Sequence, residues 1–450
     1  MAPDAQPDDA VPPILDLPER RLVDPDGTHR SADAQATEIT RRWNDWRRGD
    51  RVVAQLIASR NSRATEGADY LAVETRGRRL DQPLVARDEW LLSIRDLARP
   101  LVRHLQRDGY VVTPVPELDN RVFTVRRVKG RAAARTVARA VDAFHEGRSR
   151  PRGGSSPFEI AHHYLAPMGV VVKADCGPEP SPGFAPQPPV GGDGPRVAVI
   201  DTGITDQVRT DGWLGNAPVG ANVDLLDDFS PFGLLDPGAG HGTFVAGVIE
   251  QIAPGVVVDV HRALDSDGLG GEAAAASAMV RAARNGATII NLSFGMETDD
   301  DRPPLALAVA VEIIRTRYPD VLLVAAAGNF GRSRPCWPAA FKGVTAVGAL
   351  TRTLDGAEWS SRGSWVDVST IGEAVLSTYV TGDEIDGDTY PVDPWAVWSG
   401  TSFAAPQVVA AVALLVQRTG SSPRDALARL LDGREERPEF GRIVQILPPR

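Results

Sequence analysis

From residue 196 onward, short apolar runs alternate with longer stretches in which apolar residues recur every three or four positions. The short runs predict strands at 197–200, 256–261, 287–292, 321–326 and 344–349. The longer stretches predict helices at 244–252, 272–285, 305–317 and 407–416. Strands that are almost entirely apolar and joined by helices indicate a parallel sheet with helices on both faces. We therefore expect an α/β, doubly wound domain over residues 195–450.

The first third of the chain has a mixed pattern, which predicts a smaller α+β module over residues 31–155. Its expected helices are 31–48, 89–106 with a break at Pro100, and 132–146. Its expected strands are 52–59, 70–75, 111–115 and 121–128, the last two paired as a hairpin. Residues 1–30 are predicted to be a flexible arm, and residues 156–194, with a stretch rich in Pro and Gly, a linker.

Composition limits the class of protein. A chain of 450 residues that is 42% hydrophobic can bury a large core and has room for two domains. No run approaches the roughly 18 to 20 consecutive apolar residues of a membrane span, so no membrane contact is expected. Residues 1–10 lack the basic and apolar regions of a secretory signal, which predicts a cytoplasmic location. Cys176 and Cys336 are too few for a disulfide framework, and both are expected to be free thiols.

Charge is distributed unevenly along a chain whose net charge is −10. Basic residues outnumber acidic ones between residues 41 and 160, whereas the rest of the chain is acidic. Such a division indicates either contact with nucleic acid or docking of one part of the chain on the other. No nucleic-acid motif or interleaved aromatic pattern accompanies the arginines. We therefore expect no nucleic-acid partner, and we expect the N-terminal module to dock on the acidic domain.

Ser402 is the first candidate for chemistry. It lies in Gly400-Thr401-Ser402, directly ahead of the apolar helix predicted at 407–416. A helix N-terminus offers free backbone N–H groups and a dipole that favours negative charge, which suits the nucleophile of an acyl transfer. The alternative is that Thr401 or Ser402 only caps the helix.

Two further residues argue against the capping alternative. Asp201 directly follows the strand predicted at 197–200, and His241 lies just before the helix predicted at 244–252. Asp, His and Ser therefore occur in this order, each at the edge of a regular element. This is the chain order of one of the convergent catalytic triads of serine proteases.

The segments around these residues resemble the signature segments of the subtilisin-like serine proteases, the subtilases. They are Asp201-Thr202-Gly203, Gly240-His241-Gly242-Thr243 and Gly400-Thr401-Ser402. A fourth segment, Ala327-Gly328-Asn329, resembles the oxyanion-hole motif of the family. The resemblance covers the chain from about residue 196 onward. It implies a serine endopeptidase in which Ser402 attacks a peptide carbonyl, His241 transfers the proton, Asp201 orients the imidazole and Asn329 stabilises the oxyanion.

The resemblance also implies a groove for a protein or peptide substrate. Residues 291–295 resemble the strand that flanks the primary specificity pocket, and residues 267–271 resemble the opposing edge, so a peptide would bind between them by strand addition. The implied contacts are Gly268, Gly270, Ser293, Phe294, Gly295, Phe330 and Cys336. Phe330 at the rim and Cys336 at the floor bring no fixed charge. A pocket of this kind is expected to accept apolar side chains of medium size.

Several alternatives stay open. No cofactor is expected, and the acidic loops at 224–228 and 299–301 are assigned no metal ligands, although many subtilases bind calcium. The N-terminal module has the position and size of a subtilase pro-domain, but a separate regulatory domain fits equally well. Two rival functions are a protease-like fold that binds peptides without turnover and a processing enzyme with one protein substrate.

Overall fold

A computed structural model describes the chain in thirteen pieces. They are residues 46–65, 70–75, 83–94, 99–127, 158–167, 177–181, 183, 192, 194–215, 217–220, 222–229, 231–385 and 387–447. The arm expected at 1–30, the helix expected at 132–146 and Cys176 lie outside the described residues. So does most of the helix expected at 31–48.

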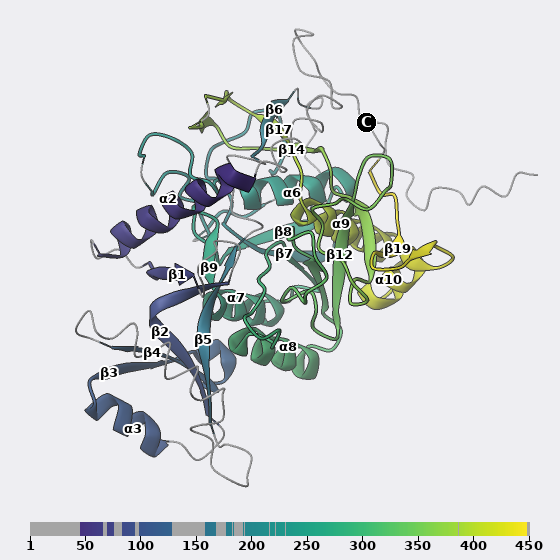
Figure 1. Ribbon diagram of the computed structural model, residues 1–450. Coiled ribbons are helices and arrows are strands. Elements are labelled where there is room, and N and C mark those ends of the chain that lie inside the picture. The colour runs from purple at the N-terminus through teal and green to yellow at the C-terminus, as the bar shows by residue number, and fades with distance from the viewer. Residues whose placement is uncertain are drawn as a thin grey trace, which may run out of the picture.

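The larger part of the molecule is built on an eight-stranded sheet of order β18-β19-β13-β12-β11-β10-β7-β8 (Figure 1). Neighbouring strands are parallel except for the β18–β19 pair. The strands are β7 (Arg196–Asp201), β8 (Val257–Arg262), β10 (Ile289–Leu292), β11 (Leu322–Ala326), β12 (Val344–Leu350), β13 (Val368–Ile371), β18 (Glu436–Arg437) and β19 (Gly441–Ile443). All five strands expected between residues 197 and 349 are among them.

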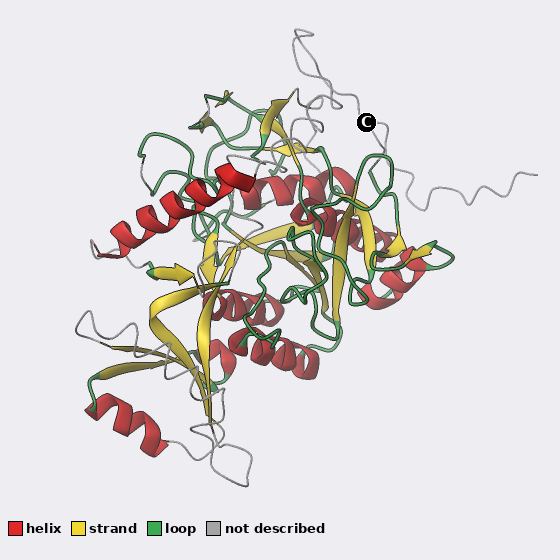
Figure 2. Ribbon diagram, viewed as in Figure 1, coloured by secondary structure: helices red, strands yellow, loops and turns green. Residues whose placement is uncertain are grey.

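Helices cover both faces of this sheet (Figure 2). They are α6 (His241–Ile252) and α9 (Thr401–Thr419) on one face, and α7 (Glu272–Arg284) and α8 (Leu305–Arg317) on the other. Strand β7 supplies both cores, because Val197 and Val199 pack with α6 and α9 whereas Ala198 and Ile200 pack with α7 and α8. Helix α10 (Pro423–Leu431) packs on α9.

Helix α9 is the central helix of the fold. It contacts β10, β11, β12 and β13 as well as α6. Its length and hydropathy would suffice for a membrane span, but most of it is buried inside the protein. Burial among the strands accounts for its apolar composition, as in the core helix of a globular domain.

The N-terminal elements form a second sheet, of order β3-β4-β2-β5-β9 with β1 paired to β2. Its strands are β1 (Val73–Thr75), β2 (Leu84–Ile94), β3 (Tyr110–Pro114), β4 (Val122–Arg127), β5 (Phe158–Pro167) and β9 (Leu269–Gly271). The associated helices are α2 (Trp46–Thr65), α3 (Arg99–Arg107) and the short 3₁₀ helix η1 (Pro116–Leu118). Strand β9 belongs to the C-terminal part of the chain, so the two parts share this sheet.

Three expectations for the N-terminal region are corrected. Residues 52–59 lie in helix α2 rather than in a strand, and the buried residues Leu56 and Arg60 lie one helical turn apart. Residues 89–94 are strand: Trp90 and Leu92 pack in one apolar cluster while Leu91 packs in another, so both faces are buried and no alternation marks the strand. Residues 158–167 form β5, inside the segment expected to be a linker.

The face of the N-terminal sheet packs against α7 and α8. Leu118 at the end of η1 is fully buried there, together with Val115 and Val122. Ion pairs surround this contact, and they run in both directions: Arg121 pairs with Glu312 at 2.9 Å, whereas Asp119 pairs with Arg317 at 2.7 Å. Each part therefore contributes both acidic and basic residues to the contact, which is not formed by a basic module against a purely acidic surface.

Short strands complete the described structure. Strand β17 (Trp395–Trp398) lies between β14 (Val375–Thr378) and β6 (Glu179–Ser181), and β15 (Gly382–Asp383) pairs with β16 (Thr389–Tyr390). Because β17 ends just before Ser399, this small sheet leads the chain into the N-terminus of α9.

Candidate active site

Asp201 and His241 make the central contact of the site. Asp201 is the last residue of β7 and His241 the first of α6. The Asp201 Oδ1 to His241 Nδ1 distance is 2.7 Å, and the two side chains are 0% and 2% exposed. Asp201 Oδ1 also accepts a hydrogen bond from the Thr202 N–H at 2.8 Å. A carboxylate on Nδ1 holds the proton there and leaves Nε2 able to accept one.

Asp224 fixes the turns that carry these two residues. Its buried carboxylate accepts hydrogen bonds from the Thr202 hydroxyl and the Gly240 N–H, both at 2.9 Å. The Thr202 hydroxyl in turn accepts from the Gly242 N–H at 3.2 Å. Burial raises the pKa of Asp224 to about 6. This role is not apparent from the sequence, in which Asp224 is only one residue of the acidic loop at 224–228.

Ser402 lies in the first turn of α9 and is almost fully buried. Its hydroxyl donates to the Ser293 carbonyl at 3.1 Å, and the Ser293 hydroxyl donates to the Ser402 carbonyl at 2.8 Å. The next residue, Phe403, lies against His241 with ring centroids 5.2 Å apart. The start of α9 therefore brings Ser402 close to the Asp201–His241 pair.

Asn329 is tied to the residue before Ser402. Its Oδ1 accepts hydrogen bonds from the backbone N–H and the hydroxyl of Thr401, at 2.9 and 2.8 Å. The Thr401 hydroxyl also accepts from the Gly328 N–H at 3.0 Å. Because Oδ1 is occupied, Nδ2 is the group that Asn329 can offer to a substrate.

The residues expected to form the specificity pocket lie together. A Cβ added to Gly295 would lie 2.5 Å from Cys336 Sγ, and one added to Gly328 would lie 2.7 Å from the same atom. The latter would also lie 3.1 Å from the ring of Phe330. Cys336 is a free, buried thiol, and burial raises its pKa well above the usual range.

Phe294 departs from the expected contact set. Its side chain is 1% exposed and packs in the apolar core below the sheet, in the cluster that contains α7 and α8. A peptide could therefore meet only its backbone.

An ion pair at the rim was not expected from the sequence. The Arg332 guanidinium lies over the Phe330 ring, 5.7 Å from its centroid, and bonds to Glu297 at 2.8 Å. Glu297 is 3% exposed. The charges of Arg332 and Glu297 neutralise each other, so neither of these two groups at the rim is an unpaired charge.

The part of the chain that carries these residues is similar to known proteins. The model of the subtilase family matches residues 192–432. The chain belongs to the subtilase family. Subtilisin BL from Lederbergia lenta is 33% identical over 239 residues, which cover 51% of this chain and 79% of that protein.

Other relatives agree. The thermophilic serine proteinase of Bacillus sp. (strain AK1) is 34% identical over 255 residues, 54% of this chain and 57% of that protein. The match therefore spans little more than half of that relative. The solved structure of fervidolysin from Fervidobacterium pennivorans, described as a keratinolytic enzyme related to subtilisin, has a TM-score of 0.56 at 19% identity and covers 83% of this chain and 61% of that one. That likeness supports the fold.

The edge of this subtilase that was expected to receive substrate is already paired. Strand β9 pairs antiparallel with the end of β5, with Leu165 opposite Gly271 and Pro167 opposite Leu269. Gly268, which precedes β9, has φ +80°, and a Cβ on Gly270 would collide with the Ala263 carbonyl. The chain thus supplies a strand of its own at the place where a peptide would add.

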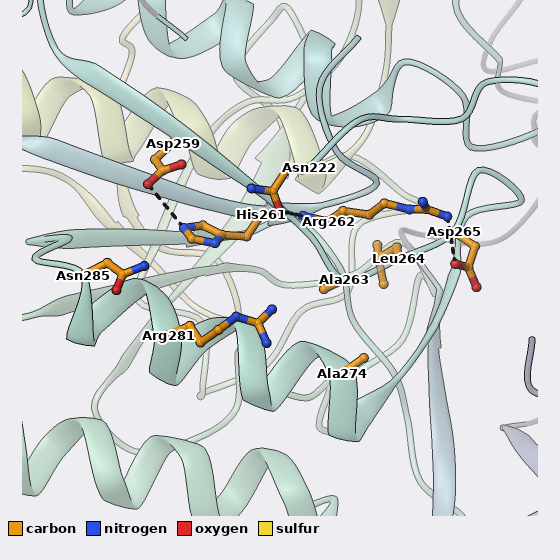
Figure 3. Close-up of a pocket in the computed structure, with 10 residues that line it drawn as sticks. All are labelled: Asn222, Asp259, His261, Arg262, Ala263, Leu264, Asp265, Ala274, Arg281 and Asn285. Atoms are coloured by element: carbon orange, nitrogen blue, oxygen red, sulfur yellow. Dashed lines mark hydrogen bonds and ion pairs between the residues drawn. The ribbon is translucent and has the colours of Figure 1, made fainter. Parts of the chain in front are cut away.

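A polar pocket of about 610 Å³ lies between β8 and α7 of the subtilase domain (Figure 3). It is lined by Asn222, Asp259, His261, Arg262, Ala263, Leu264, Asp265, Ala274, Arg281 and Asn285. None of the catalytic candidates lines it. Within the described residues, no group of three or more His, Cys, Asp or Glu side chains could hold a metal ion.

Proposed function

We propose that this chain is a serine endopeptidase in which Asp201, His241 and Ser402 form the catalytic triad. The observation that carries the proposal is the buried contact of 2.7 Å between Asp201 and His241, next to Ser402 at the start of α9. Membership of the subtilase family supports it.

The chemistry follows from the positions of these groups. Ser402 Oγ attacks the peptide carbonyl while His241 Nε2 takes its proton and later donates it to the leaving amine. Asp201 holds the proton on Nδ1 and stabilises the imidazolium. The tetrahedral oxyanion accepts hydrogen bonds from Asn329 Nδ2 and the Ser402 N–H, which lies at the positive end of the α9 dipole.

The pocket indicates which side chain precedes the cleaved bond. Cys336 between Gly295 and Gly328 limits its depth, and Phe330 borders it. The nearby charges of Arg332 and Glu297 are paired with each other. Medium apolar side chains therefore fit, whereas a charged one would have to be buried unpaired, at a cost of several kcal/mol.

Labelling and cleavage experiments test the proposal. The wild-type chain should react with a fluorophosphonate at Ser402 and should cut a proteome-derived peptide library, preferentially after medium apolar residues. Ser402→Ala should neither label nor cut, and adding His241→Ala to it should cause little further loss, because the residues act as one unit. A wild-type chain that binds peptides but neither labels nor cuts would instead be a binding protein.

The N-terminal module is proposed to limit access to the groove. Support comes from the pairing of β5 with β9, since a substrate that adds to this edge would have to displace Leu165 to Pro167. The apolar packing of Leu118 on α7 and α8 would hold the module in place.

A further inference from the structure

Arg60, from helix α2 of the N-terminal region, is buried against the turn that precedes β9. It is 1% exposed. Its Nη1 bonds to both carboxylate oxygens of Asp267 at 2.7 Å, and its Nη2 bonds to Asp265 at 2.8 Å. Its Nε donates to the Leu71 carbonyl at 3.0 Å. All three guanidinium nitrogens are therefore engaged.

The catalytic part of the chain depends on this guanidinium for charge balance. Asp267 is 1% exposed, and burial raises its pKa to about 6 even with Arg60 beside it. Asp265 is also held from the other side by Arg262, at 3.4 Å (Figure 3). Among the described residues, Asp267 has no cation other than Arg60. Removing Arg60 would leave a buried carboxylate beside a second one, a strongly unfavourable arrangement.

The same turn sets the shape of the substrate edge. Asp267 Oδ1 accepts the Leu269 N–H at 3.1 Å, and the Asp265 N–H donates to the Leu269 carbonyl at 3.0 Å. Leu269 is the first residue of β9 and lies opposite Pro167. A change in the orientation of Asp267 would therefore displace the backbone to which an extended peptide must bond.

The turn also touches the loop that carries the catalytic imidazole. The Ser266 carbonyl accepts the Gly238 N–H at 2.6 Å, and the Ser266 hydroxyl donates to Asp236 at 2.6 Å. The Gly238 carbonyl in turn accepts the His241 N–H at 3.2 Å. Arg60 thus supports two sides of the groove through one turn.

We propose that Arg60 is a positioning residue for peptide binding, and that helix α2 is consequently a working part of the enzyme. This differs from the role proposed for β5, which pairs with the edge of β9. Arg60 does not pair with that edge but holds Asp267, which bonds to the Leu269 N–H. The inference rests on the proposed endopeptidase function.

The test compares two peptides in the full chain. They share the cleaved bond, but only the longer one carries residues that reach Leu269 to Gly271. In the wild type, the longer peptide should have the higher kcat/KM. In Arg60→Gln, the ratio of the two kcat/KM values should fall about tenfold. The longer peptide must displace Leu165 to Pro167 from β9 whereas the shorter one need not, so the exchange measurement below separates a change in the turn itself from a change in that competition.

Matched variants separate positioning from general damage. Arg63→Gln removes a cation of the same helix that pairs with Asp228 at 2.6 Å, outside the turn, and should leave the ratio unchanged. Arg60→Gln combined with Asp267→Asn should recover most of the ratio, since the amide still accepts the Leu269 N–H without a buried charge. If Arg60→Gln does not fold, Arg60→Lys carries the test, with a smaller fall because lysine lacks the planar fork.

Amide hydrogen exchange gives a readout that does not need activity. Residues 265–271 should exchange at least tenfold faster in Arg60→Gln than in the wild type or Arg63→Gln. An unchanged ratio together with unchanged exchange overturns the inference. A wild-type chain that neither labels with fluorophosphonate nor cuts either peptide overturns the proposed function, while the exchange rates still decide whether Arg60 positions the turn.

Discussion

Asp224 and Ser293 hold the candidate catalytic groups although neither is expected to react. Asp224 bonds to Thr202 and Gly240, one on each side of the Asp201–His241 contact. Ser293 exchanges hydrogen bonds with Ser402 in both directions. These contacts leave the reacting side chains few conformations, which is the preorganisation that an acyl-transfer site requires.

Asn329 accepts hydrogen bonds from Thr401 through Oδ1 and is proposed to donate one to the oxyanion through Nδ2. Substitutions can separate these two roles. We expect Asn329→Ala to lower kcat by about 100- to 1000-fold with a smaller change in KM, because the donor acts on the transition state. Asn329→Asp keeps an acceptor for Thr401 but has no N–H to donate, so it should lose at least as much. Steady-state kinetics on one peptide check both variants. Activity close to wild type in Asn329→Asp would remove Asn329 from the oxyanion hole.

Cys336, which lies against Gly295 and Gly328, is the residue proposed to limit the depth of the specificity pocket. Cys336→Gly should raise kcat/KM for peptides with Phe or Tyr before the cleaved bond relative to peptides with Leu or Ala. The expected gain is about 10-fold or more, since each methylene accommodated is worth about 1 to 3 kcal/mol. Cys336→Ser, which keeps the volume almost unchanged, is the control. An unchanged preference in Cys336→Gly would mean that another residue forms the floor.

At the scale of single residues, the sequence indicates the candidate catalytic residues but not the hydrogen-bond partners that lie far from them along the chain. Asp201, His241, Asn329 and Ser402 stand in short segments rich in Gly and small residues, at the ends of strongly patterned elements. The bond from Thr401 to Asn329 joins residues 72 positions apart, and nothing local marks it. Buried polar partners of this kind follow from tertiary packing, which periodicity does not encode.

At the scale of elements, prediction succeeded where one pattern dominates. Five of the parallel strands and the four helices that pack on the sheet were expected, although α9 begins six residues before its expected start, and β13 and β19 were not expected. Prediction failed at residues 52–59, where β-branched residues suggested a strand but α2 packs against Leu269 of β9. It also failed at residues 89–94, where helix-favouring residues are misleading and β2 is paired on both edges. Tertiary contacts override weak local propensity in such cases.

The docking of η1 on α7 and α8 should depend on apolar packing more than on charge. We expect Leu118→Ala to lower the free energy of unfolding by about 2 to 5 kcal/mol, because it leaves a cavity at a fully buried position. Arg317→Ala, which breaks the partly exposed pair with Asp119, should cost about 1 kcal/mol or less. Urea denaturation measures both. Equal losses would mean that the ion pairs hold the module.

At the scale of the whole molecule, buried carboxyls couple stability to pH. Burial raises the pKa of Asp224 and Asp267 to about 6, and that of Asp236 and Glu272 to about 7. Between about pH 4 and 7 the folded chain therefore holds protons that the unfolded chain has lost. The free energy of unfolding contributed by these groups falls as pH rises through this range and is constant above it.

Glu272→Gln tests this coupling. The variant should show a shallower fall in the free energy of unfolding between pH 5 and 7, by at most about 1.4 kcal/mol per pH unit, since one titrating group is removed. Denaturation by urea at several pH values provides the slopes. Identical slopes in the two proteins would show that Glu272 titrates at its ordinary pKa in the folded state.

Because Ser402 lies at the start of α9, the proposed triad can be completed only late in the synthesis of the chain. About 200 residues separate Asp201 from Ser402, and synthesis at about 5 to 20 residues per second adds them in about 10 to 40 s. During that interval the nascent chain lacks both Ser402 and the helix that covers one face of the sheet. Cleavage by the proposed triad therefore has to wait until nearly the whole domain has been made and α9 has packed across its sheet.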